Sequence, residues 1–312
     1  MKTFSVVDSQ LQASIVKRVI CLSWQDFGYK KIIKKIKEEF FVNLSPGLLS
    51  YWFNNEVRLY GGQNHFDSKP TKELAYFLGV MFGDGSLFFH KCKGDYAIRL
   101  EAVDKDFVDH FSFCVSKILN KEKNYTVISC KRRSMDSVMY STKARSKELY
   151  FFIKDIKEDF EKVKPFVEAY PKEFIQGLAD SEGCPVISAG VCFKVRVIVA
   201  CSTNKSLLEF VSFLLIKFGI NSSLFLSKKA GATDSIINGR YITRTKNLYS
   251  LQISNFRNVK VFSNQINFNI KRKNQKLFDA IFTFEDISVK NPTGFWLENY
   301  EKKSNQWFVK QQ

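Results

Sequence analysis

Two short segments of this 312-residue chain combine glycines with one carboxylate in the same order. They are Phe77–Gly85, which contains Asp84, and Ile175–Gly183, which contains Glu182 in the matching place 98 residues later. Two carboxylates brought together are a ligand set for Mg²⁺, which keeps several waters and also takes phosphate oxygens. Such a site suits phosphodiester hydrolysis. The segments therefore predict a divalent-metal centre, provided that the fold brings both acids to one place.

Small residues at helical spacing indicate how the acids meet. Gly79 and Gly83 lie four residues apart in the first segment, and Gly177 and Ser181 repeat that spacing in the second. Residues four apart share one face of a helix, so both segments predict helices whose backbones approach closely on these faces. Packing of the two helices would place the two acids side by side. Taken alone, either segment is better explained as a capped amphipathic helix with a solvated acid, and only the matched pair favours a shared site.

A glycine follows each acid, namely Gly85 and Gly183. We expect these glycines to be left-handed residues that end the two helices. The acids then lie at helix C-termini, where the helix dipole is negative, and their mutual repulsion calls for a cation. We expect Mg²⁺, with Mn²⁺ able to substitute, and the carbonyls of Gly83 and Ser181 as further ligands. Asp180 is interpreted as a flanking residue.

The chain around the two segments is duplicated. Lys105–Lys117 matches Lys205–Lys217 at an offset of 100, and Lys147–Tyr150 resembles Lys246–Tyr249 at an offset of 99. Alternating strand patterns and helical periods make each copy read as helix, two strands, helix, two strands, helix. We therefore predict an α+β protein of two pseudo-symmetric αββαββα halves that pack through their motif helices, each half with an antiparallel sheet.

Residues 8–57 predict three short helices, which form a small all-α N-terminal domain. Ser45 is the expected N-cap of the third helix, with Pro46 in its first turn. The arrangement resembles a helix-turn-helix DNA-binding module. The lysines of the second helix, Lys30, Lys31 and Lys34, are expected to contact phosphates. The alternative is an ordinary helical bundle with a solvated lysine face.

The overall charge favours a polyanionic partner. The chain has 48 lysines and arginines against 31 acids, a net charge of +17, and nucleic acid is the leading candidate. A lysine-rich proteome is the alternative explanation. Seven cysteines without a CxxC pair argue against a disulfide framework and a zinc site. With no signal peptide or long apolar run, we expect no membrane contact and no secretion, and a cytoplasmic, nucleoid-associated or organellar location.

The two segments resemble the dodecapeptide motif of LAGLIDADG homing endonucleases, in the single-chain form with two motifs. Ala169–Gly183 is a close match, and the resemblance covers roughly residues 72–285. It implies that the motif helices form the seam between the halves and that both sheets lie along the major groove of DNA. It also implies metal-dependent cleavage of both strands with short 3′ overhangs, and it makes Asp84 and Glu182 the catalytic, metal-binding acids.

The resemblance further implies a basic residue near each scissile phosphate. Lys271 fits that place in the second copy, and Lys164 is the choice in the shortened first copy. The sheets are expected to read DNA through basic side chains on one face, although each of these can equally be a solvated surface charge. The expected DNA-contacting residues of the sheets are Arg99, Lys131, Arg132, Lys143, Arg145, Lys194, Arg196, Lys228, Lys229, Arg240, Arg244 and Lys246.

Four segments follow from these patterns. They are a helix-turn-helix-like DNA-binding domain (1–66), a first half (67–168), a second half (169–285) and a C-terminal tail of no evident role (286–312). The expected function is that of a monomeric, site-specific endonuclease that cuts double-stranded DNA, either free-standing or encoded in an intron. The alternatives are an RNA maturase that binds host intron RNA, and a DNA-binding regulator of the same fold that does not cleave.

Overall fold

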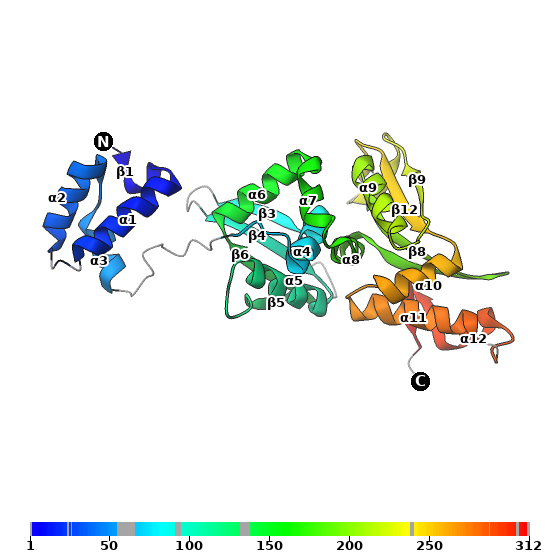
Figure 1. Ribbon diagram of the computed structural model, residues 1–312. Helices are drawn as coiled ribbons and strands as arrows, with labels where there is room; N and C mark the ends of the chain where they lie inside the picture. The colour runs from blue at the N-terminus through cyan, green and yellow to red at the C-terminus, as the bar shows by residue number, and fades with distance from the viewer. Residues whose placement is uncertain are drawn as a thin grey trace. The chain divides into compact units, whose positions relative to one another are not determined.

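The computed structural model describes residues 2–23, 25, 27–54, 66–90, 95–131, 138–237, 240–286, 288–303 and 306–310. The chain divides into two compact units, Met1–Asn64 and His65–Gln312. Both are shown in Figure 1. None of the described helices combines the length and the apolar character needed to cross a membrane.

The first unit contains the three predicted helices. They are α1 (Ser9–Ser23), α2 (Tyr29–Phe40) and α3 (Pro46–Asn54). Ile32 and Ile36 of α2 are fully buried, so its apolar stripe faces the core of the unit. The Ser45 hydroxyl accepts a hydrogen bond from the Leu48 amide at 3.1 Å. This bond confirms Ser45 as the N-cap of α3.

The prediction that the first unit is purely helical was wrong. The strand β1 (Lys2–Thr3) pairs in parallel with β2 (Val42–Asn43), and a 3-10 turn, η1 (Phe4–Val6), follows β1. Phe41 has a φ of 56° and ends α2 in the left-handed region. The chain therefore leaves the helix as a short extended run, and its free backbone edge takes up the N-terminal residues.

The second unit contains two copies of one topology. The first copy has α4 (Lys72–Phe82), β3 (Ser86–His90), β4 (Asp95–Ala102), α5 (Lys105–Ile118), β5 (Val127–Lys131), β6 (Val138–Arg145), α6 (Lys147–Glu158), η3 (Phe160–Val163) and α7 (Lys164–Val167). The second copy has α8 (Pro171–Glu182), β7 (Cys184–Ala189), β8 (Phe193–Ser202), α9 (Lys205–Ile216), β9 (Ser223–Lys228), β10 (Thr233–Ile237), β11 (Arg240–Thr243), β12 (Leu248–Ile253), α10 (Phe256–Gln265) and α11 (Lys271–Glu285).

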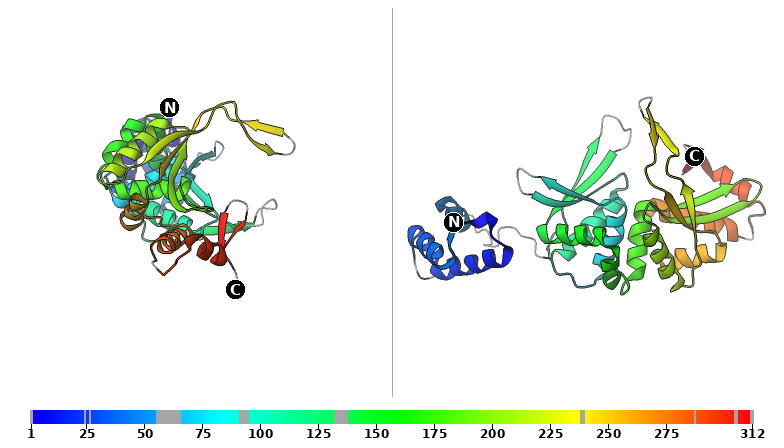
Figure 2. Two further views of the ribbon diagram at one scale, coloured as in Figure 1. Left: turned by 90° about the vertical axis from the view of Figure 1, so that its right-hand side faces the viewer. Right: turned by 90° about the horizontal axis from the view of Figure 1, so that it is seen from above.

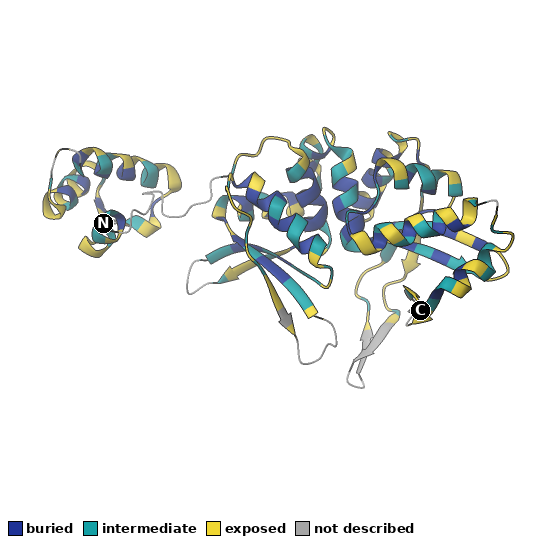
Figure 3. Ribbon diagram, turned by 90° about the horizontal axis from the view of Figure 1, so that it is seen from below, coloured by how far each residue is buried: buried dark blue, intermediate teal, exposed yellow. Residues whose placement is uncertain are grey.

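The two four-stranded sheets have the same strand order, β3-β4-β6-β5 and β7-β8-β12-β9, and every neighbouring pair is antiparallel. Along β8 the side chains of Phe193, Val195 and Val197 are buried, whereas Lys194 between the first two is exposed. Helices cover the buried faces of both sheets (Figure 3). The predicted α+β fold of two αββαββα halves is confirmed, and one face of each sheet is left open.

The duplication holds in detail for α5 and α9. Lys105 pairs with Asp109 at 2.6 Å, and Lys205 pairs with Glu209 at 2.8 Å in the same turn of the second copy. The proposed match of Lys147–Tyr150 with Lys246–Tyr249 was wrong, because the first run opens α6 and the second leads into β12. The second copy contains an extra hairpin, β10–β11 (Figure 2). This insertion increases the sequence offset between the two copies for all elements that follow it.

The C-terminal segment is folded onto the second half. It contains α12 (Pro292–Asn299) and the antiparallel hairpin β13 (Tyr300–Lys303) and β14 (Gln306–Val309). Trp296 is fully buried and stacks on Tyr300 with ring centroids 3.8 Å apart. The indole of Trp307 donates to the carbonyl of Ile187 on edge strand β7 at 3.1 Å. The hairpin therefore protects part of that edge.

Candidate active site at the seam of the motif helices

The motif helices α4 and α8 pack at a separation that only glycine allows. A Cβ atom added to Gly79 would lie 2.3 Å from the Phe174 carbonyl oxygen, and one added to Gly177 would lie 2.2 Å from that of Tyr76. A Cβ atom on Gly83 would meet the side chain of Ser181 at 2.3 Å. These contacts confirm the prediction that the small-residue faces of the two helices meet.

The glycines after the acids do not have the predicted left-handed conformation. Among the described glycines, only Gly219 and Gly231 have positive φ values, and Gly183 is extended with a φ of −96°. Close packing is the reason for glycine instead. A Cβ on Gly85 would lie 2.8 Å from the Cα of Met81, and one on Gly183 would lie 2.6 Å from the Val199 carbonyl oxygen.

The two acids lie at the same end of the seam. Asp84 follows α4 in an exposed turn, and Glu182 is the last residue of α8 and half-buried. Burial raises the pKa of Asp84. Burial also raises the pKa of Glu182, and the charge of Asp84 raises it further. The carboxylates therefore repel each other, as expected for two acids that share one site.

The two carboxylates are hard oxygen donors of the kind that divalent cations take. Within the described residues, no group of three or more histidine, cysteine or acidic side chains is placed to hold a metal ion. Two carboxylates leave positions for water and for a phosphate oxygen, which is how Mg²⁺ is usually bound. The solvent-facing side of Asp84 keeps the pair accessible to a polyanionic ligand.

A lysine approaches the end of each motif helix, and sequence reasoning missed both. Lys273, which is buried, donates to the carbonyls of Ala179, at 3.3 Å, and Asp180. Lys157 donates to the carbonyl of Gly85 at 3.4 Å. Removal of water from the ammonium group lowers the pKa of each lysine. Their spacing was the signal that could have identified them. Lys273 lies four residues before the buried Leu277 and Lys157 four residues after the buried Ile153, so each lysine shares the buried face of its helix.

Lys273 is also the lysine whose charge reaches the acids, since it lowers the pKa of both Asp84 and Glu182. The predicted Lys271 is exposed at the start of α11, and its backbone amide donates to Asp106 at 2.8 Å. The predicted Lys164 pairs with Glu161 at 2.5 Å. The roles assigned to Lys271 and Lys164 stay predictions.

Asp180 is buried in the seam and accepts several hydrogen bonds there. Its carboxylate accepts hydrogen bonds from the Tyr76 hydroxyl at 2.7 Å and from the amides of Asn269 at 3.0 Å and Ile270 at 3.2 Å. Burial raises the pKa of Asp180 to about 6. With its oxygens occupied by these donors, Asp180 links α4, α8 and the approach to α11.

Basic side chains lie on the open face of the first sheet. Lys143 and Arg145 on β6 both pair with Asp95 on β4, at 2.8 and 3.0 Å. Arg99 pairs with Glu101 two residues along β4. The remaining predicted residues of this sheet are Lys131, which is exposed at the end of β5, and Arg132, which lies outside the described residues.

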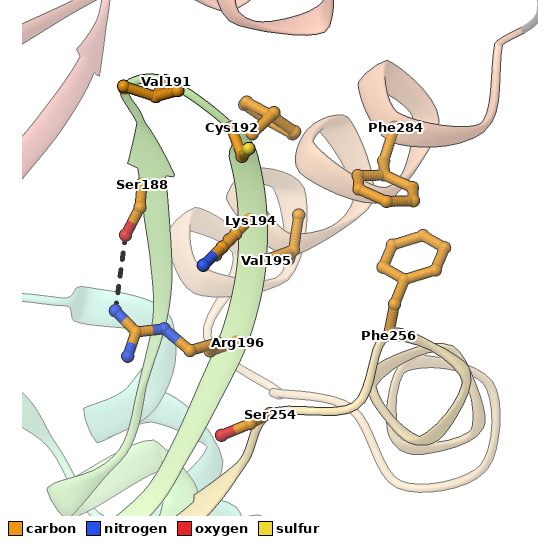
Figure 4. A pocket seen from close by; sticks show the side chains of 11 residues that line it. Ser188, Val191, Cys192, Lys194, Val195, Arg196, Ser254, Phe256 and Phe284 are labelled. Carbon is orange, nitrogen blue, oxygen red and sulfur yellow. Dashed lines mark hydrogen bonds between the residues drawn. The ribbon is translucent and has the colours of Figure 1, made fainter.

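The second sheet carries its basic residues in the same way. The side chains of Lys194 and Arg196, both on β8, line a cavity of about 810 Å³ (Figure 4). Arg196 donates a hydrogen bond to the Ser188 hydroxyl there at 3.3 Å. Phe256 and Phe284 form the apolar wall of this cavity. The other predicted residues are Arg244, which is partly buried, the exposed Lys228, Lys229 and Lys246, and Arg240, whose side chain lies outside the described part.

The predicted phosphate contacts of the first unit are on the solvent side of α2. Lys30, Lys31 and Lys34 are all exposed, opposite the buried isoleucines of that helix. Lys34 forms a long pair with Glu38, at 4.0 Å. The three ammonium groups therefore remain accessible to an anionic partner.

Parts of the chain are similar in sequence to known proteins. A family model described as a LAGLIDADG-like domain matches residues 169–267. An uncharacterized protein of Methanocaldococcus jannaschii is 34% identical over 264 residues, which span 84% of this chain and 91% of that protein. The homing endonuclease I-DmoI of Desulfurococcus mucosus is 26% identical over 165 residues, which span 52% of this chain and 78% of the relative.

Among solved structures, the LAGLIDADG homing endonuclease I-GzeII in complex with its DNA target aligns with a TM-score of 0.47 and 12% identity. The alignment covers 76% of this chain and 100% of that one. With its duplicated motif, its glycine-packed helices and its relatives in sequence, the chain belongs to the LAGLIDADG family.

Proposed function

We propose that this protein is a site-specific endonuclease that makes metal-dependent double-strand breaks in DNA and leaves short 3′ overhangs. The observation that carries the proposal is the pair of mutually repelling carboxylates, Asp84 and Glu182, at one end of a glycine-packed seam. The net charge of +17 and the family membership support a DNA substrate. The single chain already contains both motifs, which supports action as a monomer.

Asp84 and Glu182 would hold Mg²⁺, with the nearby carbonyls of Gly83 and Ser181 as further oxygen donors. When bound, the ion supplies activation of water and stabilisation of the leaving oxygen. The chain itself orients the two acids through the rigid contact of α4 and α8. It also brings the positive charge of Lys273 to the site, where that charge favours the ionised carboxylates.

The test is a plasmid assay. A plasmid library with randomised inserts is incubated with the purified protein and Mg²⁺, and linearised members are recovered and sequenced. We expect linear product at one family of sites with Mg²⁺ and none with EDTA. Linear product of unchanged yield in EDTA, or random fragmentation, would contradict the proposal.

Lys273 is expected to matter more for cleavage than the sequence-predicted Lys271. Replacing one preorganised charge beside the reacting groups costs about 10²-fold in rate, so Lys273→Met is expected to slow single-turnover cleavage to about that extent. Lys271→Met is the matched control on the same helical turn, and we expect a loss of less than about threefold, since exposed charges contribute little. Circular dichroism checks that both variants fold. If Lys271→Met slows cleavage more than Lys273→Met does, Lys271 and not Lys273 is the basic residue that matters for cleavage.

The first unit is proposed to add a DNA contact as a helix-turn-helix module. Because Lys30, Lys31 and Lys34 are exposed along one helix, their replacement by glutamine is expected to weaken DNA binding. The slope of log affinity against log salt should fall by up to about 0.9 for each phosphate that one of these lysines neutralises. Lys17→Gln on the exposed side of α1 serves as control. An unchanged slope in the triple variant would argue for a solvated lysine face.

A further inference from the structure

A second cavity, of about 570 Å³, is lined from Gly183 onward, and Gly183 directly follows Glu182 in the chain. One wall is the chain from Gly183 to Ser188, which begins at the residue after Glu182. The opposite wall comes from the first turns of α11, and the C-terminal hairpin adds Lys302 and Trp307. The cavity therefore lies at the outer edge of β7, between the second half and the C-terminal segment.

Positive charge dominates this cavity. Its cationic lining residues are Arg196, Arg272, Lys273, Lys276 and Lys302, and the described lining contains no carboxylate. Arg272 is balanced from outside by Asp104, at 2.9 Å. Among the described residues, Lys276 and Lys302 form no ion pair with an acid. Burial lowers the pKa of Lys276, and the charge of Arg272 lowers it further.

Cations that converge on one cavity cost stability in the free protein, because like charges repel. For the buried Lys273 and the half-buried Lys276, the loss of hydration adds to this cost. An anion in the cavity would offset this cost. The cavity is too polar and too basic for an apolar ligand. Its lining begins at Gly183, the residue after Glu182, so an occupant would lie against the stretch of chain that directly follows one of the two motif acids.

The C-terminal hairpin holds Lys302 in place. Trp307 is fixed by its hydrogen bond to the Ile187 carbonyl, and Lys302 lies over the Trp307 ring, 6.0 Å from its centroid. The base of the hairpin is anchored by the stacked pair Trp296 and Tyr300. A segment whose sequence indicated no role thus contributes a charged residue to a site beside the acids.

We propose that this cavity seats a backbone phosphate of the target DNA next to the Glu182 carboxylate, and that the C-terminal hairpin supplies one of its cations. The proposal rests on the proposed function, in that the ligand is the DNA being cut. Successive phosphates of one strand are about 3.4 Å apart along the helix axis. A strand that passes the acids therefore brings neighbouring phosphates within reach of the cavity.

The experiment uses the full chain with Lys276→Gln, Lys302→Gln and the double substitution. Binding to a duplex of about 30 base pairs and mixed sequence is measured in Ca²⁺ over a range of salt concentrations. We expect the double variant to bind about 10-fold more weakly and its log–log salt slope to fall by about 0.9, the value for one neutralised phosphate. Lys217→Gln, an exposed lysine at the end of α9, is the matched control and should bind as the wild type does.

A second arm identifies the phosphate. In the selected target duplex, single phosphates near the cut are replaced one at a time by neutral methylphosphonates. At one position the replacement should weaken binding by the wild type but have no further effect on the double variant. An unchanged slope, or additive losses at every position, overturns the proposal.

The two proposals fail in different ways. If the wild type cuts DNA and the double variant behaves like it, the phosphate site alone is wrong. If the wild type binds DNA without cutting it, the endonuclease function is wrong, and the salt slope still decides the phosphate site. If the wild type neither binds nor cuts DNA, both are wrong.

Discussion

Replacement of both motif acids, Asp84→Asn with Glu182→Gln, is expected to abolish cleavage of the selected plasmid while DNA binding persists. The two carboxylates lie at the same end of the seam. Without them the transition state would lose several kcal/mol of metal-assisted stabilisation. Each factor of ten in rate corresponds to about 1.36 kcal/mol, so the expected loss is about 10³-fold or more. Linear product is quantified on gels under single-turnover conditions, with Mg²⁺ in excess.

The control for this double variant is Glu38→Gln with Asp109→Asn. Glu38 belongs to the first unit and Asp109 to α5, and each acid is at least partly exposed and engaged in a helical surface pair. Their replacement is expected to leave the cleavage rate within about threefold of the wild type, since such pairs are worth little. Binding of both double variants to target DNA is compared by gel shift. Full cleavage by the Asp84 and Glu182 variant would remove the site assignment.

The second large effect is expected from one methyl group at the seam. Gly177→Ala should gain up to about 1 kcal/mol of helix propensity. The new Cβ, however, would lie 2.2 Å from the Tyr76 carbonyl oxygen, which belongs to the backbone of the opposing helix and has no free direction in which to move. Overpacking of this kind costs roughly 3 kcal/mol or more, so the clash outweighs the propensity. Urea denaturation of the full chain measures the difference.

Gly190→Ala is the matched control in the same unit, because a Cβ there would meet nothing within 4 Å. We expect its unfolding midpoint to stay close to that of the wild type. The Gly177 variant is also expected to lose cleavage along with stability, since a wider seam separates the two acids. A Gly177 variant as stable as the wild type would mean that the helices pack more loosely than the contact distances indicate.

Local patterns were sufficient for much of the fold. The 98-residue repeat of glycine and acid, together with helical and alternating periods, predicted two αββαββα halves and a glycine-mediated seam. These features depend on neighbours in the chain or on similar local sequences, so they are readable without coordinates. The cap at Ser45 belongs to the same class, because an N-cap bond reaches only three residues ahead.

Other features depend on residues far apart in sequence. Gly183 looks like a left-handed cap by position alone, and only its contact with the Val199 carbonyl on β8 shows why glycine is required there. Lys271 and Lys273 are two residues apart in one basic run, and the direction in which α11 enters the seam decides that Lys273 is the buried one. No local pattern encodes that direction.

The amino-acid sequence by itself determined the duplicated architecture, the two acids and the basic character of the protein, because these follow from residue types and short-range periodicity. Only the tertiary structure decided which lysine of α11 is buried against the end of α8 and where the C-terminal hairpin lies. It alone also showed that five cations converge on one cavity whose lining begins at Gly183. These features result from contacts between segments that are far apart in the chain. The free energy of such a contact depends on how both segments bury each other's side chains, so neither segment encodes it alone.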